Sequence, residues 1–164
     1  MTTPQQFPLF RYEAQGRDSF GFLLASAVVY ILQAPDGKKT RIHLTNQDSL
    51  VVMDDIMVIV EKMEKALMPS YVPSLGVERV SPLVEFTQVG NDTPGFVVGR
   101  MLTHLSKAPE NRRNRIHLVN REVLQTPEDL ISLARKFEKC LQLTGGQLRL
   151  TELEFKPNDR HHSR

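Results

Sequence analysis

Hydrophobic and polar residues alternate in two separate segments, residues 10–15 and 83–89, and this pattern predicts a β-strand in each. After the second segment, apolar residues recur with helical spacing while polar residues lie off that stripe. Thr93-Pro94 offers an N-cap and a first-turn proline, and Pro109 offers a stop. The stripe consists of Val97, Val98, Met101, Leu102 and Leu105.

We therefore predict a helix over about residues 94–107, and by comparison another over about 20–33. Residues 23–32 are nearly all apolar, so their own periodicity decides nothing. One long strand in each place is the alternative. It segregates side chains less well, because it sets Arg100 and His104 among apolar neighbours.

Each predicted helix is followed by a polar loop, a short strand (41–45 and 115–119) and a second helix. The earlier second helix runs from about Asp54 to Leu67. The later one opens at Thr126-Pro127-Glu128-Asp129, whose cap, proline and two acids suit a helix start. Alternating apolar residues over 147–155 predict a last strand, and residues 156–164 form a polar, mobile tail. The apolar positions of the later helix are Leu130, Leu133, Ala134, Phe137 and Leu141.

The two series of elements are related by an ungapped repeat with an offset of 74 residues. It runs from Tyr12 and Phe86 to Leu67 and Leu141, and 17 of its 56 residue pairs are identical. The block Arg-Ile-His-Leu occurs at both 41–44 and 115–118. We infer two copies of one unit with the order strand–helix–strand–helix–strand.

This unit order predicts an α+β protein built from two tandem β-α-β-α-β repeats. Its boundaries are 7–75 for the first repeat, 76–155 for the second and 156–164 for the tail. A unit of this length, with a basic loop between its first helix and second strand, resembles the Alba-type domain, and the C-terminal domain of translation initiation factor three has a similar order. The Alba resemblance implies binding of RNA or DNA, with the two repeats forming an internal pseudo-dimer.

Charge adds to this expectation. The chain has 164 residues and a formal net charge of +2. Residues 1–75 contain 7 Lys and Arg against 8 Asp and Glu, whereas residues 76–164 contain 14 against 11. Arginine suits phosphate because its planar guanidinium donates two hydrogen bonds at once. A solvated loop and helix face is the alternative interpretation of such a run of charges.

We therefore predict nucleic-acid binding by a basic helix side and loop of the second repeat, with a weaker counterpart in the first. Aromatic residues make up only 7% of the chain and tryptophan is absent, so extensive base stacking is not expected. The predicted contacts are Arg100, His104 and Lys107 on the helix, Arg112, Arg113 and Arg115 in the loop, and Lys38, Lys39 and Arg41 in the first repeat.

The alternative function is that of an assembly subunit in a larger complex. The predicted helix at 20–33 is apolar nearly all round, with Val29 and Leu32 off its main stripe. Such a helix is covered on more than one side, by the other repeat or by a partner protein.

Catalysis, metal binding and cofactor binding are not expected. One cysteine excludes an internal disulfide and a cysteine-based zinc site, and Cys140 fits a small buried residue. His43 and His117 occupy equivalent strand positions without further ligands nearby in sequence, which favours a structural role. The longest apolar run, 22–32, is too short to span a bilayer, and no secretory signal is visible. We expect an intracellular protein without membrane contact.

Overall fold

The computed structural model describes residues 9–68, 81–90, 93–108 and 113–142. The first half contains β1 (Leu9–Glu13), β2 (Phe20–Leu24), β3 (Val28–Gln33), β4 (Thr40–Leu44), β5 (Ser49–Val52) and α1 (Ile56–Leu67). The second half contains β6 (Leu83–Thr87), β7 (Pro94–Val98), β8 (Leu102–Lys107), β9 (Asn114–Leu118), β10 (Val123–Thr126) and α2 (Leu130–Leu141). Every element of the second half begins and ends 74 residues after its counterpart, and we call residues with this offset equivalent.

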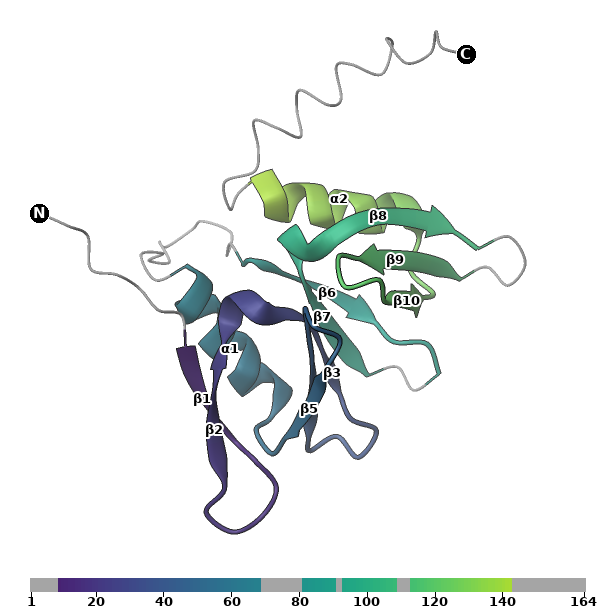
Figure 1. The fold of residues 1–164 in the computed structure, drawn as a ribbon. Coiled ribbons are helices and arrows are strands. Elements are labelled where there is room, and N and C mark those ends of the chain that lie inside the picture. The colour runs from purple at the N-terminus through teal and green to yellow at the C-terminus, as the bar shows by residue number, and fades with distance from the viewer. Residues whose placement is uncertain (1–8, 69–80, 91–92, 109–112, 143–164) are drawn as a thin grey trace, which may run out of the picture.

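The strands form three antiparallel sheets, as Figure 1 shows. The central sheet has the order β5-β4-β3-β7-β6, and it is flanked by the β1-β2 hairpin and by the sheet β10-β9-β8. One face of the central sheet, including Ile31 and Ile42, packs into a core with α1. Its other face, including Tyr30 and Val97, packs into a second core with α2. Two cores therefore lie on opposite faces of one shared sheet.

The expected α+β fold of two β-α-β-α-β repeats is wrong. The described residues contain ten strands in three sheets and only two α-helices, so the fold is mostly β. The predicted helices at 20–33 and 94–107 are each two strands joined by one 3-10 turn, at Ala25–Ala27 and Gly99–Met101. The element order expected from the Alba-type resemblance is therefore not found.

The misleading apolar stripe has a physical origin. The 3-10 turn transfers the chain from one sheet to another, so the alternation of β7 does not continue in phase into β8. Val97 and Val98 thus point to the two faces of the central sheet, whereas Leu105 belongs to a different sheet. In the first half, β3 lies between β4 and β7 with a core on each face, so it is apolar at nearly every position.

Several other expectations are confirmed. Strands occur at the predicted places of β1, β4, β6 and β9, and helices at those of α1 and α2. The later helix starts after Asp129, which caps it, while Thr126 ends β10. The sequence pattern does not predict β5 and β10, each of which follows a tight turn with a positive φ, at Gln47 and Arg121. The strand expected at 147–155 and the tail at 156–164 lie outside the described residues.

The two halves are joined by antiparallel pairing of β3 with β7, in which Ile31 lies opposite Phe96. The expected pseudo-dimer is not found, because two-fold symmetry would also pair the equivalent strands β8 and β2. Among the described residues, however, β2 and β8 are each an edge strand of a different sheet and do not pair with each other. The contact between the halves is therefore heterologous.

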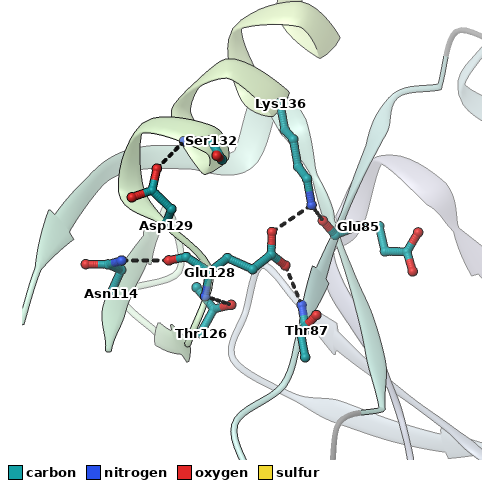
Figure 2. A network of polar contacts seen from close by, with 8 residues as sticks. All are labelled: Glu85, Thr87, Asn114, Thr126, Glu128, Asp129, Ser132 and Lys136. Atoms are coloured by element: carbon teal, nitrogen blue, oxygen red, sulfur yellow. Dashed lines mark hydrogen bonds and ion pairs between the residues drawn. The ribbon is translucent and has the colours of Figure 1, made fainter. Parts of the chain in front are cut away.

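A polar network fixes α2 to the sheet (Figure 2). The Glu128 carboxylate accepts a hydrogen bond from Thr87 N at 2.7 Å and pairs with Lys136 Nζ at 2.7 Å. Lys136 Nζ also donates to the backbone oxygen of Glu85 at 3.0 Å, and Asn114 Nδ2 donates to the backbone oxygen of Glu128 at 2.6 Å.

The first half contains the same network at equivalent positions. Asp54 accepts from Glu13 N at 2.8 Å and pairs with Lys62 Nζ at 3.3 Å. Lys62 Nζ donates to the backbone oxygen of Arg11 at 2.7 Å, and the Thr40 hydroxyl donates to the backbone oxygen of Asp54 at 2.8 Å. The second half therefore presents β8, β9 and β10 on a scaffold that the first half repeats.

Candidate nucleic-acid interface

The face of the sheet β10-β9-β8 that points away from the second core carries polar and basic side chains. Alternation along each strand turns Leu105, Ile116 and Leu124 toward the core and turns their neighbours outward. The strand register arranges the outward residues in two rows across the sheet. We call this surface the outer sheet face: His104, His117 and Val123 form one row, and Ser106, Arg115 and Gln125 form the other.

Two imidazole rings stack in the first row. The centroids of His104 and His117 are 3.8 Å apart and their planes differ by 8°. The Ser106 hydroxyl lies 2.8 Å from His117 Nε2, and the Thr103 hydroxyl lies 3.1 Å from His104 Nδ1. Thr103 also donates to the backbone oxygen of His117 at 2.9 Å. The two rings are thus held in place by hydroxyl groups of their own sheet.

Two arginines lie beside this stack. Arg115 is half-buried beside Ser106 and Gln125, and Arg113 is exposed with its Nη1 3.4 Å from Gln125 Oε1. Strands β8, β9 and β10 contain no Asp or Glu. The carboxylate of Glu122, in the turn between β9 and β10, already accepts from Asn120 Nδ2 at 2.6 Å. The outer sheet face therefore offers donors and positive charge without acidic side chains on its own strands.

The pKa of His117 is lowered from its ordinary value. Burial disfavours the imidazolium most strongly, and the charges of His104 and Arg115 oppose it further. The neutral imidazole of His117, with one ring nitrogen as donor and the other as acceptor, is therefore favoured over the imidazolium. Its ring remains a flat aromatic surface next to the cationic side chains.

The equivalent face in the first half is covered. Tyr30 and His43, equivalent to His104 and His117, stack in the same way at 4.1 Å and 8°. Tyr30 is buried in the second core, and burial together with the nearby Glu122 carboxylate raises its pKa above the ordinary value. Burial lowers the pKa of His43, with Arg41 adding to this effect and Glu122 opposing it. Only the second half therefore leaves this face open among the described residues.

The predicted basic side of a helix is corrected by the strand geometry. Arg100, His104 and Lys107 are all exposed, but Arg100 lies in the 3-10 turn before β8 and Lys107 at the far end of β8. Alternation along β8 groups His104 with Ser106 and turns Lys107 to the opposite face. Arg113 lies directly before β9, beside the outer sheet face, and Arg115 is part of β9 and of that face. Arg112 lies outside the described residues.

The basic residues of the first half lie elsewhere. Lys38 and Lys39 belong to the loop between β3 and β4, where their backbone N–H groups donate to Asp36 Oδ1 at 2.8 and 3.1 Å. These two bonds lower the pKa of Asp36. Arg41 is exposed on β4. Figure 1 shows the end of the β8-β9 hairpin well apart from the ends of β3 and β5, so the two sets of basic residues do not form one surface.

The predicted protein-interface residues are used inside the chain. Val29 is fully buried in the second core, and Leu32 packs against that core. The other half of the chain therefore covers this segment, one of the two possibilities that the sequence left open. The segment is strand β3, not the expected helix.

The grouping of Ser106, His117 and Gln125 with Arg115 is not predicted from the sequence. Their signal is the strict alternation of outward and inward residues in β9 and β10, which becomes useful only when β8 is assigned as a strand. Cys140 is buried, as expected, with its Sγ 3.4 Å from the backbone oxygen of Ser81.

Among the described residues, no group of three or more His, Cys, Asp or Glu side chains is arranged to hold a metal ion. Within the same ranges, no helix has both the length and the apolar character needed to cross a membrane.

No protein-family model matches the chain, and no curated protein matches its sequence. One solved structure with a related arrangement is described as the "LytTr DNA-binding domain of putative methyl-accepting/DNA response regulator from Bacillus cereus". It is 13% identical, with a TM-score of 0.44, and the match covers 79% of this chain and 94% of that one.

Proposed function

We propose that this protein binds nucleic acid, RNA or DNA, through the outer sheet face of β8, β9 and β10. The observation that carries the proposal is the contrast between two equivalent faces. The Tyr30–His43 face is closed by the chain itself, whereas the His104–His117 face is open, basic and free of acidic residues on its strands.

Phosphate contacts are assigned to Arg115 and Arg113, with Arg100, in the 3-10 turn before β8, at the margin. Guanidinium groups bind phosphate oxygens through charge-assisted, often bidentate hydrogen bonds. Neutralising phosphates releases condensed counterions, so the affinity falls as salt rises. Such contacts fix the position of the nucleic acid without reading its sequence.

The stacked imidazoles and the neighbouring hydroxyl and amide groups suit an unpaired base. Aromatic side chains on an open sheet stack with bases that are splayed out of a single strand. Ser106 and Gln125 lie in the adjacent row, where they can bond to sugar or base edges. These features favour a single-stranded ligand over a duplex.

Fluorescence anisotropy tests the proposal with labelled single-stranded RNA, single-stranded DNA and duplex DNA over a salt series. The variant Arg113→Ala/Arg115→Ala should bind more weakly and reduce the salt slope by about 1 per lost phosphate contact. The matched control is Lys39→Ala/Arg41→Ala, which changes the equivalent positions of the first half and should retain most of the affinity. Unchanged binding by Arg113→Ala/Arg115→Ala, or no binding by folded wild type at low salt, would contradict the proposal.

A further inference from the structure

The β1-β2 hairpin exposes large apolar side chains on one face. Phe10 and Leu23 point inward and are buried in the first core. On the outward face, Leu9 is 53% exposed, Phe20 51%, Phe22 62% and Leu24 41%. Exposed apolar residues that gather on one face, unlike single ones, mark a surface that a partner covers.

The equivalent face of the β6-β7 hairpin shows what covers such a surface. Leu83, Phe96 and Val98 are equivalent to Leu9, Phe22 and Leu24, yet each is at most 7% exposed. They are buried because β7 pairs with β3 and their side chains enter the core beneath α1. The first half thus covers the hairpin of the second half, while the hairpin of the first half has no such cover among the described residues.

The two strand edges needed to repeat this contact are both open. Strand β2 is equivalent to β7 and pairs only with β1, and β8 is equivalent to β3 and pairs only with β9, within the part of the chain that the structure describes. The bond from Ala14 N to Ser19 O (2.9 Å) sets the hydrogen-bond alternation of the hairpin. This alternation directs the backbone groups of Phe20, Phe22 and Leu24 toward the open edge of β2. Figure 1 shows β2 and β8 in opposite parts of the molecule, so one chain cannot bring its own two edges together.

We propose that copies of this chain associate head to tail, with the open edge of β8 in one copy paired antiparallel with the open edge of β2 in the next. The register follows from the internal contact, in which Tyr30, Ile31 and Leu32 lie opposite Val97, Phe96 and Gly95. The equivalent pairs between copies are His104 with Leu23, Leu105 with Phe22, and Ser106 with Gly21.

The side chains at this edge suit a reversible contact. Leu105 keeps the apolar character of Ile31, so it can pack beside Phe22, and α2 then covers the exposed hairpin as α1 covers the internal one. Thr103, His104 and Ser106 stand where the internal strand has Val29, Tyr30 and Leu32. These polar replacements weaken the contact relative to the internal one.

By the same equivalence, the assembly covers His104, as the internal contact buries Tyr30, and it leaves Arg115 accessible. Arg41, the equivalent of Arg115, is exposed although its half is engaged in the internal contact. A heterologous contact also does not stop at two copies unless its geometry closes a ring. Head-to-tail association therefore predicts species larger than a dimer.

The first test is the oligomeric state of the full chain by analytical ultracentrifugation over a concentration series. Wild type should form species that grow with concentration beyond a dimer. Phe22→Glu should remain a monomer, whereas Ile131→Glu, which changes an exposed apolar residue of α2, should still associate. A folded wild type that is monomeric at hundreds of micromolar, or association unaffected by Phe22→Glu, would overturn the proposal.

Cysteine cross-linking tests the register. A mixture of Phe22→Cys and Leu105→Cys proteins should give a disulfide-linked heterodimer on oxidation, and wild type with its buried Cys140 should not. Phe22→Cys alone should give no cross-link, because in the proposed register residue 22 of one copy lies opposite residue 105 of the next copy and not opposite another residue 22. A cross-link between two Phe22→Cys chains would show symmetric pairing instead, and the absence of any cross-link in the mixture would reject the register.

Discussion

Lys136 Nζ lies 2.7 Å from Glu128 Oε1, and the equivalent pair, Lys62 and Asp54, has the same arrangement at 3.3 Å. In both halves the ammonium also donates to a backbone oxygen in the first strand of the hairpin. The lysine therefore connects the last helix of each half to the strand that begins that half. This contact spans 51 residues of sequence in each half.

The substitution Lys136→Met should destabilise the fold by about 1–2 kcal/mol, because it removes a charge-assisted bond and leaves the half-buried Glu128 carboxylate without its cation. Methionine retains most of the apolar stem, so lost packing contributes little. Urea unfolding measures the change, with Arg135→Met on the exposed side of α2 as the control. Equal unfolding midpoints for the two variants would show that the ion pair adds nothing.

Gly99 and Cys140 should behave as a coupled pair. A Cβ added at Gly99 would lie 2.6 Å from Cys140 Sγ, so Gly99→Ala should cost roughly 1–3 kcal/mol through overpacking. The equivalent pair in the first half is Ala25 with Ala66, and both belong to the first core. Gly99→Ala/Cys140→Ala should therefore recover part of the loss.

The measurement for this pair is a double-mutant cycle by urea unfolding. A coupling energy near zero would mean that Gly99 is required for a reason other than the proximity of the sulfur. Cys140→Ala alone supplies the cost of the cavity that the smaller side chain leaves.

Stability should fall as the pH drops below about 6.5. The pKa values of His43 and His117 are lowered in the folded protein, so the unfolded chain binds more protons just below the ordinary histidine pKa of about 6.5. The stabilisation is fully present above that pH and is lost as the pH falls toward the folded pKa values. Urea midpoints between pH 8 and 5 measure this dependence, and His43→Gln and His117→Gln should each reduce it.

The imidazole signals of His43 and His117 in NMR spectra provide the direct check. Both should titrate below pH 6.5. Titration of either at or above 6.5 would contradict the assigned direction, whatever the unfolding data show.

Restoring a first-half side chain on β8 should strengthen association between copies. Ser106→Leu places at this position the leucine that Leu32 supplies in the internal contact with Gly95. Sedimentation should show larger species at lower concentration than for wild type. Adding Phe22→Glu to the same chain should reverse the effect, whereas self-association that persists in the double variant would indicate non-specific aggregation through the new leucine.

The sequence predicts both α-helices because apolar residues follow an acidic start, at Asp55 and Asp129, and lie on one side of the helix with polar residues on the other. It does not predict that 20–33 and 94–107 are strands. A 3-10 turn of three residues shifts the phase of alternation there, and β3 is apolar on both faces. Local periodicity cannot reveal this burial, because it arises from pairing with β7, which lies more than 60 residues away in the chain.

The candidate site, too, is predicted from the sequence only where the signal is local. The local density of positive charge in the sequence predicts Arg113 and Arg115 as contacts. The neighbours Ser106 and His117 were not grouped with them, because a helical assignment of 94–107 places His104 beside Lys107 rather than beside Ser106. Once β8 is a strand, its register with β9 brings the stacked imidazoles and Arg115 onto one face.

The pairing of β3 with β7 also determines how the molecule unfolds. Val29 and Tyr30 complete the core that holds α2, while Phe96 and Val98 complete the core that holds α1. Neither half can lose its packing without exposing apolar side chains of the other. We therefore expect the whole chain to unfold as one cooperative unit. Calorimetry should therefore record a single transition in which the calorimetric and van't Hoff enthalpies agree, and neither half expressed alone should keep its native core.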